Sequence, residues 1–356
     1  MAFLFGHEYS KKEILSRVGD LSQVAGIRMM QLQDGSEAGV RIADLRTGSG
    51  LRFQVSLDRG MDISIADYKG LPLAWRSASG DVHPSYFDPR GTGWGRSFPG
   101  GLMTGCGMSF LGAPCVDAGE ELGLHGRLSN LPASGVGTET HWENDTCVMQ
   151  LHGLVRESGL FKENLLLHRT IETRLGESLI TISDHVRNEG YQTSPLMMLY
   201  HINAGWPLVD EGSRLLLNSK SMKPRDAEAE KGVHDASTFS SPASGYREQV
   251  FFHDLLADAD GFVTALLMGS KARIGLCVRF RQKELSRYIE WKMMGEGTYV
   301  VGMEPANCGV GGRAKERAAG TLQFLEPGEE RRFLVQIGVV AGGKELSNFI
   351  EKHALT

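Results

Sequence analysis

The feature that most constrains the fold of this chain is a series of short apolar or alternating segments along most of its length. Runs of four to eight such residues, bounded by Gly, Asp and Asn, are typical of β-strands that end in tight turns. Many short strands at this spacing favour an all-β fold, a large antiparallel β-sandwich, over alternating βαβ units. The predicted strands are residues 26–32, 51–57, 61–68, 165–175, 179–186, 250–253, 262–268, 274–280, 288–294, 298–303, 321–325 and 332–340.

The whole chain, residues 1–356, is predicted to form a single domain. Helical spacing of apolar residues occurs only near the ends, at 11–18 and 345–353. Residues 79–119 are rich in Gly, Pro and aromatic side chains, and are too long for a plain connection, so we expect an irregular wall over a site. Residues 220–247 are polar and are predicted to be an exposed excursion between strands.

Composition excludes several classes of protein. A hydrophobic fraction of 41% with 23% charged residues is that of a soluble globular chain, and a net charge of -5 gives no basic stripe for nucleic acid. The start has no basic region of a signal peptide, and no run reaches the ~18 apolar residues of a membrane span. The five cysteines have no Cys-x-x-Cys spacing, so we expect reduced thiols in a cytoplasmic protein. The oligomeric state stays open, a homodimer being one option.

Three segments far apart in the sequence each offer one acid–base group in a β-like context. They centre on His125, His201 and Glu304. A buried ionisable group is costly unless it is paired or used. Two imidazoles and a carboxylate are the minimum needed to take a proton from one atom and deliver one to another. The chain is therefore predicted to be an enzyme, with Glu304 and His201 as its catalytic pair.

His201 and Glu304 each have a plainer interpretation. His201 ends an apolar run and can be a core histidine bonded to backbone, but Asn203 two residues on faces the same side of a strand. With its ordinary pKa, His201 would be an acid near neutrality. Glu304 can be a strand-end carboxylate capping a turn, because Pro305 is expected to end the ladder there.

Asn203 and further polar and aromatic residues are candidates for substrate binding. Arg127, close to His125, can donate two parallel hydrogen bonds to vicinal hydroxyls or to a carboxylate. Its plainer interpretation is a polar residue in a turn between strands. Lys292 enters the same strand pair as Glu304, Arg59 lies in a turn between strands, and Trp206 offers a face for a sugar ring. Together Arg127, Lys292 and Arg59 hint at an acidic substituent on the substrate.

A metal site is the alternative use of the same region. His125, His201 and Glu120 are ligand types that zinc accepts. The chain has no local His-x-His pair, so we favour a site without metal.

The order of these segments, from about residue 8 to 340, resembles the aldose 1-epimerase (galactose mutarotase-like) superfamily, and most of all a subgroup of uncharacterised bacterial members. Leu124-His125-Gly126 matches the family's Leu-His-Gly segment, and Tyr200-His201 holds the place of its Asn-His segment. The resemblance implies a mutarotase-type sandwich in which Glu304 is the base at the anomeric hydroxyl and His201 the acid at the ring oxygen. It implies that His125 binds or polarises the sugar and that no cofactor is needed.

The chain also departs from the family pattern. Tyr200 replaces the family's Asn, Arg127 stands where a Gly is usual, and residues 100–107 lack the Gly-Arg-x-x-Asn-Arg segment. The acid and base therefore transfer, whereas the sugar specificity does not. Mutarotation of a monosaccharide is the expected activity. A proton-transfer isomerase acting beside a sugar carbonyl and a non-catalytic carbohydrate-binding protein are the alternatives.

Overall fold

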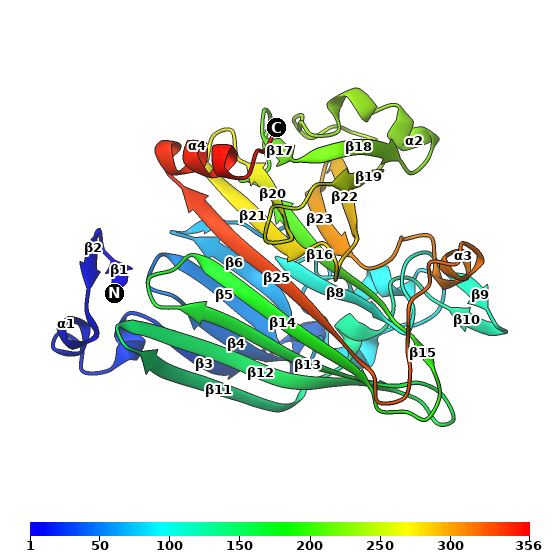
Figure 1. The fold of residues 1–356 in the computed structure, drawn as a ribbon, viewed down its shortest axis with the longest axis horizontal. Helices are drawn as coiled ribbons and strands as arrows, with labels where there is room; N and C mark the ends of the chain where they lie inside the picture. The colour runs from blue at the N-terminus through cyan, green and yellow to red at the C-terminus, as the bar shows by residue number, and fades with distance from the viewer.

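Two large antiparallel β-sheets form the body of the molecule, as the strand pattern predicted. The computed structural model describes residues 1–356, and Figure 1 shows the two sheets as separate layers. The eight-stranded sheet has the order β11 (Ser134–Glu143), β12 (Thr146–Ser158), β13 (Asn164–Arg174), β14 (Leu179–Asn188), β25 (Glu330–Ala341), β21 (Ile274–Arg281), β20 (Phe262–Met268) and β17 (Arg214–Leu217).

The second sheet has eleven strands and carries the segments that the sequence marked for chemistry. Its order is β18 (Ser219–Pro224), β19 (Gln249–Leu255), β22 (Arg287–Gly295), β23 (Thr298–Ala306), β16 (Met197–Gly205), β8 (Met103–Met108), β6 (Asp62–Tyr68), β5 (Leu51–Ser56), β4 (Arg41–Arg46) and β3 (Gly26–Gln31), with β7 (Leu71–Pro72) paired to β6.

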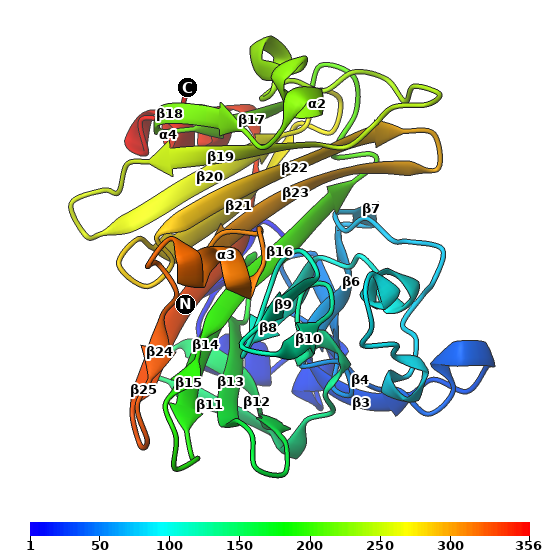
Figure 2. The same cartoon turned by 90° about the vertical axis from the view of Figure 1, so that its right-hand side faces the viewer.

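Smaller elements sit around the two sheets. Figure 2 shows α3 (Arg313–Ala318) and the hairpin of β9 (Cys115–Asp117) and β10 (Glu120–Leu122) beside β16 and β8. None of the helices has the length and apolar character that a membrane span requires. The remaining strands and α-helices are β1 (Ala2–Leu4), β2 (His7–Tyr9), α1 (Lys11–Leu15), β15 (Ser194–Pro195), α2 (Ala227–Glu230), β24 (Phe324–Leu325) and α4 (Gly343–Lys352).

The predicted strands occur within a few residues of their expected bounds, and the structure corrects the sequence at several places. Helices are not confined to the chain ends, because α2 and α3 lie between strands. The stretch 79–119 contains the central strand β8, whose Gly- and Met-rich sequence has only one of the β-branched residues that mark strands, Thr104. Residues 321–325 form only the two-residue strand β24.

Pro305 does not end its strand, contrary to the prediction. It lies opposite Tyr288 of β22, and β23 continues to Ala306. On its other side, the ladder with β16 has partners at Leu199 and Ile202 but none between them. A proline has no N–H to donate, so it is tolerated where this ladder is interrupted. The interruption lies at Tyr200 and His201.

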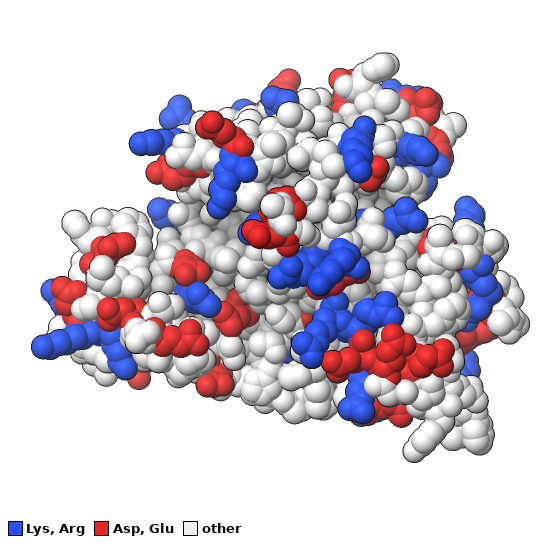
Figure 3. Space-filling view, in the orientation of Figure 1, with Lys and Arg blue, Asp and Glu red and all other residues white.

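A buried charged network joins the two sheets. Arg169 of β13 forms a bidentate salt bridge with Asp184 of β14, with N–O distances of 2.9 and 2.6 Å. Tyr200 of β16, in the other sheet, donates to the same carboxylate at 2.7 Å. The rest of the space between the sheets is filled by one large apolar cluster. On the outside of the eight-stranded sheet, acidic and basic side chains are intermingled (Figure 3).

Candidate functional site

A cavity of about 280 Å³ opens on the outer face of the eleven-stranded sheet, just below the usual size range for small-molecule sites. Strands β16, β19, β22 and β23 form its floor, and segments before and after β8 form its walls. The lining residues are Trp94, Phe98, Ala113, Leu124, His125, His201, Arg225, Glu248, Val250, Ile289, Trp291, Glu304 and Val310. The stretch 79–119 thus contributes walls to the cavity, as the sequence predicted.

Strand register decides which side chains reach the floor. Glu304 of β23 lies directly opposite Ile289 of β22, and Gly302 opposite Trp291. Directly opposed residues share a face of the sheet, so Glu304, Ile289 and Trp291 all point into the cavity. A Cβ at position 302 would clash with Glu304 Oε1 and would lie 2.9 Å from Trp291 Cβ. Glycine at this position leaves room for both side chains.

His201 and Glu304 meet at the bottom of the cavity. Nε2 of His201 lies 3.2 Å from Oε1 of Glu304, and the side chains are 7% and 4% exposed. The contact lacks the alignment of a hydrogen bond, and Oε1 of Glu304 and Nδ1 of His201 have no other partner. Buried polar atoms are nearly always hydrogen-bonded in native proteins. Their lack of partners here marks a place where a polar ligand would be bound.

Burial sets the protonation of this pair. It raises the pKa of Glu304 to about 8, with a further contribution from the Glu248 carboxylate. Burial lowers the pKa of His201 to about 3, with His125 adding to the effect. Both side chains are therefore neutral at pH 7. Of the two protons that can titrate in this pair, only the one on the Glu304 carboxyl is bound. This differs from the prediction that His201 has its ordinary pKa, because the imidazole is removed from water.

His125 completes a ring of aromatic groups around the pair. Its backbone is left-handed, with φ of 55°. Its ring lies 4.8 Å from that of Trp94 and 6.1 Å from that of His201, between centroids. Phe98 and Trp291 flank His201 at 5.2 and 5.4 Å. Burial lowers the pKa of His125 to about 4, so this imidazole is also neutral and can donate or accept one hydrogen bond.

The sequence analysis missed Arg225 and Glu248, the polar groups at the cavity mouth. Glu248 accepts from Arg225 Nη2 and from the indole N–H of Trp291, each at 2.9 Å. Residues 220–247 are therefore more than an exposed excursion, since they contain most of β18 and all of α2 and supply Arg225. Glu248 lies two residues before Val250 of β19, which also lines the cavity. This alternation was the available signal.

The structure brings three of the candidate residues together, namely His125, His201 and Glu304. Asn203 is buried behind the cavity, and its amide donates to the carbonyls of His201 and Gly101 at 2.8 and 3.0 Å. It shapes the strand that carries His201 and does not line the cavity.

The four remaining candidates lie elsewhere. Lys292 follows Trp291 and so points to the opposite face of the sheet, where its ammonium donates to the carbonyls of residues 235 and 238. Arg59 is fully buried and bonds to backbone carbonyls of residues 82 and 97. Trp206 is 66% exposed, outside the cavity. Arg127 pairs with Glu157 and lines a separate polar hollow. Without these cations in the cavity, the hint of an acidic substituent loses its basis.

The alternative metal site does not form either. The carboxylate of Glu120 is bound by Lys162 and Arg313, at 2.7 and 2.8 Å, in the separate polar hollow. It does not reach His125 or His201. No group of three or more His, Cys, Asp or Glu side chains converges on a metal-sized site.

Known proteins share this architecture. The chain matches the family model described as "Domain of unknown function (DUF4432)" over residues 37–339, and no curated protein sequence matches it. A candidate aldose 1-epimerase from Klebsiella pneumoniae is 25% identical, with a TM-score of 0.88 over 92% of this chain and 86% of that chain. A galactose mutarotase-like protein from Clostridium acetobutylicum is 11% identical, with a TM-score of 0.61 over 90% of this chain and all of that chain. Galactose 1-epimerase from Lactobacillus acidophilus is 13% identical, with a TM-score of 0.55 over 88% and 98% of the two chains. The last two show the fold alone.

Proposed function

Because the chain belongs to the DUF4432 family and has the galactose mutarotase-like fold, we propose that it is a carbohydrate-binding isomerase that interconverts the anomers of a free monosaccharide. The observation that carries this proposal is the buried pair of His201 and Glu304, 3.2 Å apart with unpartnered polar atoms, in a cavity of about 280 Å³. The likeness of the whole chain to a candidate aldose 1-epimerase supports it.

The proposed chemistry needs two protons to move in opposite directions. The neutral carboxyl of Glu304 donates its proton to the ring oxygen, and Nε2 of His201 accepts the proton of the anomeric hydroxyl. The bond between C1 and the ring oxygen breaks, and C1 becomes an aldehyde. These roles are the reverse of those that the resemblance implied. Burial of both groups in the free protein favours the neutral forms.

Ring closure reverses the transfers. Rotation about the C1–C2 bond turns the other face of the aldehyde toward the hydroxyl on C5. Glu304, now a carboxylate, takes the proton of that hydroxyl as it attacks C1. The His201 imidazolium, 3.2 Å from the carboxylate, protonates the aldehyde oxygen. The pair ends with the single proton that it had at the start, so neither a redox step nor a cofactor enters the cycle.

The charges at the mouth favour a neutral sugar. The guanidinium of Arg225 is already bound by Asp226 at 2.7 Å and Glu248 at 2.9 Å. A carboxylate or phosphate on the substrate would meet a guanidinium whose charge these two carboxylates already offset, and the Glu248 carboxylate beside it would repel the anion. Hydroxyl groups, in contrast, can donate to Glu248 and accept from Nη1 of Arg225, which has no partner in the structure. The aromatic walls suit the apolar face of a sugar ring.

The direct test measures exchange between the α and β anomers. Proton exchange spectroscopy on a panel of neutral hexoses, pentoses and one uronic acid should show faster interconversion with the protein, and fastest with a neutral sugar. The same preparation carrying Glu304→Gln is the control for contaminating mutarotase. Binding without faster exchange would leave a carbohydrate-binding protein. Incorporation of solvent deuterium at C2 would indicate an isomerase acting beside a carbonyl.

The pH dependence of kcat/KM should report one proton shared by the pair. Activity requires Glu304 protonated and His201 neutral, or the equivalent state with the proton moved across. We expect a plateau between the two pKa values of about 3 and about 8, with a fall above pH 8 as Glu304 loses its proton. Any residual activity of Glu304→Gln should lack that alkaline fall. Activity that rises through pH 8 would contradict the one-proton scheme.

A further inference from the structure

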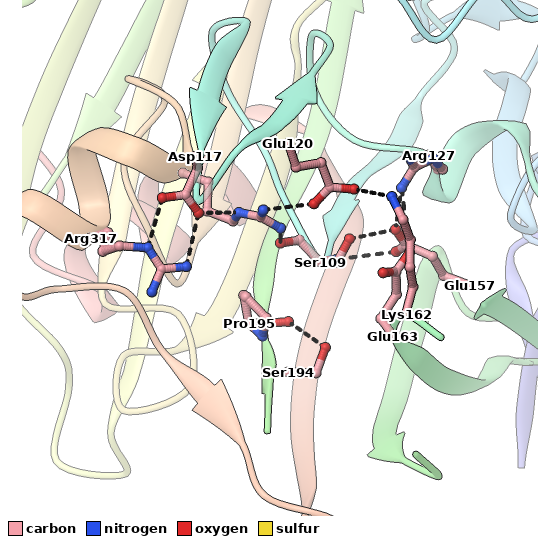
Figure 4. Close-up of polar contacts among 11 residues, drawn as sticks. Ser109, Asp117, Glu120, Arg127, Glu157, Lys162, Glu163, Ser194, Pro195 and Arg317 are labelled. Atoms are coloured by element: carbon pink, nitrogen blue, oxygen red, sulfur yellow. Dashed lines mark hydrogen bonds and ion pairs between the residues drawn. The ribbon is translucent and has the colours of Figure 1, made fainter. Parts of the chain in front are cut away.

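A buried carboxylate lies outside the cavity and binds Ser109 and Arg127, two residues that line the separate polar hollow. Glu157 of β12 is only 2% exposed at its side chain. It accepts from the backbone N–H of Ser109 at 3.1 Å, from the Ser109 hydroxyl at 2.6 Å, and from Arg127 Nη1 at 3.1 Å (Figure 4). Burial raises the pKa of Glu157, and the Ser109 and Arg127 contacts oppose that shift. A carboxylate in such a place requires these partners.

Arg127 is fixed by more than one element. Its guanidinium lies over the ring of Phe110, 4.9 Å from the centroid, and 3.6 Å from Glu163. Glu157 and Glu163 flank the turn between β12 and β13, whereas Phe110 follows β8. Arg127 therefore ties the chain just after His125 to two other parts of the molecule. Figure 4 shows Arg127 and Ser109 directed to the same carboxylate of Glu157.

The two residues before Arg127 have left-handed backbones, with φ of 55° at His125 and 81° at Gly126. A non-glycine residue in this region is sparsely populated and persists when its surroundings determine it. The N–H of His125 donates to Gly112 O at 3.0 Å, and its carbonyl accepts from Gly107 N at 2.9 Å. A Cβ at position 126 would lie 2.5 Å from the carbonyl oxygen of Phe110. His125 is thus packed onto residues 107–112, the segment that contains Ser109.

Glu157 holds both sides of this arrangement, since it binds Ser109 in the supporting segment and Arg127 at the end of the His125 turn. We propose that Arg127 and Glu157 are positioning residues, which hold the imidazole of His125 in the cavity without touching the sugar. The role in turnover rests on the proposed function. Arg127, which the sequence suggested as a sugar ligand, would then act through His125.

The first test reads the state of His125 directly and needs no turnover. In the wild-type protein the pKa of His125 is about 4, well below its ordinary value of 6.5, because of burial. In proton NMR spectra, the chemical shifts of its ring protons should therefore stay constant between about pH 5 and 8. These signals are assigned by their loss in His125→Asn. In Arg127→Met the released turn should expose the ring to water, and its signals should titrate within that window.

Two further variants separate positioning from general damage. Glu157→Gln keeps an acceptor for Ser109 but removes the charge that holds Arg127, so it should also make His125 titrate. Arg156, which precedes Glu157 on β12, forms an exposed ion pair with Glu189. Arg156→Met removes this pair and should leave the His125 signals unchanged. If the His125 signals do not titrate between about pH 5 and 8 in folded Arg127→Met and in Glu157→Gln, the positioning role is refuted.

Kinetics provide the second test. If His125 contributes to turnover, Arg127→Met should lower kcat/KM roughly 10- to 100-fold, the range expected for a misplaced group. In a His125→Asn background the same substitution should add little, because the group it positions is already absent. Equal losses in both backgrounds would overturn the proposal. A wild-type protein without anomerase activity would instead refute the proposed function, and the spectroscopic test would still decide the positioning role.

Discussion

Replacing Glu304 with glutamine should lower turnover by roughly 10²–10⁴-fold, the usual contribution of a positioned acid or base. Glutamine fills the same space opposite Ile289 but cannot give a proton to the ring oxygen or take one back. His201→Asn keeps a hydrogen-bonding group and loses the proton acceptor, so it should cost a similar factor. Single-turnover measurements of anomer exchange would isolate the chemical step from product release.

The same sheet offers a matched control. Glu290 of β22 is also buried and also contacts a histidine, with Oε2 at 2.9 Å from His253 Nε2, but it points to the opposite face. Glu290→Gln should therefore change stability without a comparable loss of turnover. The double variant of Glu304 and His201 should be little worse than either single one, since the two groups act as a unit. Near-normal activity in Glu304→Gln would rule out the mechanism.

Breaking the charged network between the sheets should produce the largest loss of stability. Removing the carboxylate of Asp184 by substitution with alanine leaves the fully buried guanidinium of Arg169 and the hydroxyl of Tyr200 without their partner. Breaking a buried ion pair typically costs about 3–5 kcal/mol of unfolding free energy. Guanidinium denaturation followed by fluorescence and circular dichroism would measure this loss, provided that both probes give one transition.

An exposed ion pair serves as the comparison. Arg332 and Glu330 are 3.0 Å apart on β25, with side chains largely in water, and Glu330→Gln should cost at most about 1 kcal/mol. Adding Arg169→Met to the Asp184 variant should recover part of the loss, because the buried guanidinium that lacks its carboxylate is then removed. The recovery should be partial, because Asp62 loses the Arg169 cation 3.9 Å away. If Asp184→Ala is as stable as the wild type, the network does not hold the sheets together.

The sequence by itself determined the fold class and pointed to three ionisable residues that line the cavity. Strand alternation and turn residues are local signals, so the predicted bounds of β3, β5, β20 and β21 lie within one residue of the observed ones. His125, His201 and Glu304 could be found because each occurs in a short recognisable segment. All three line one cavity. The order of their segments along the chain was the basis of the resemblance to the mutarotase-like family.

The tertiary structure alone decided which polar groups face the cavity and how they are protonated. Lys292 and Glu304 belong to paired strands, yet the register places Lys292 opposite Val301 and leaves it on the other face. Arg225 and Glu248, and likewise Arg127 and Glu157, are pairs that only folding brings together. The one-proton state of His201 and Glu304 has the same origin, because removal from water, which no residue specifies locally, favours the neutral form of each.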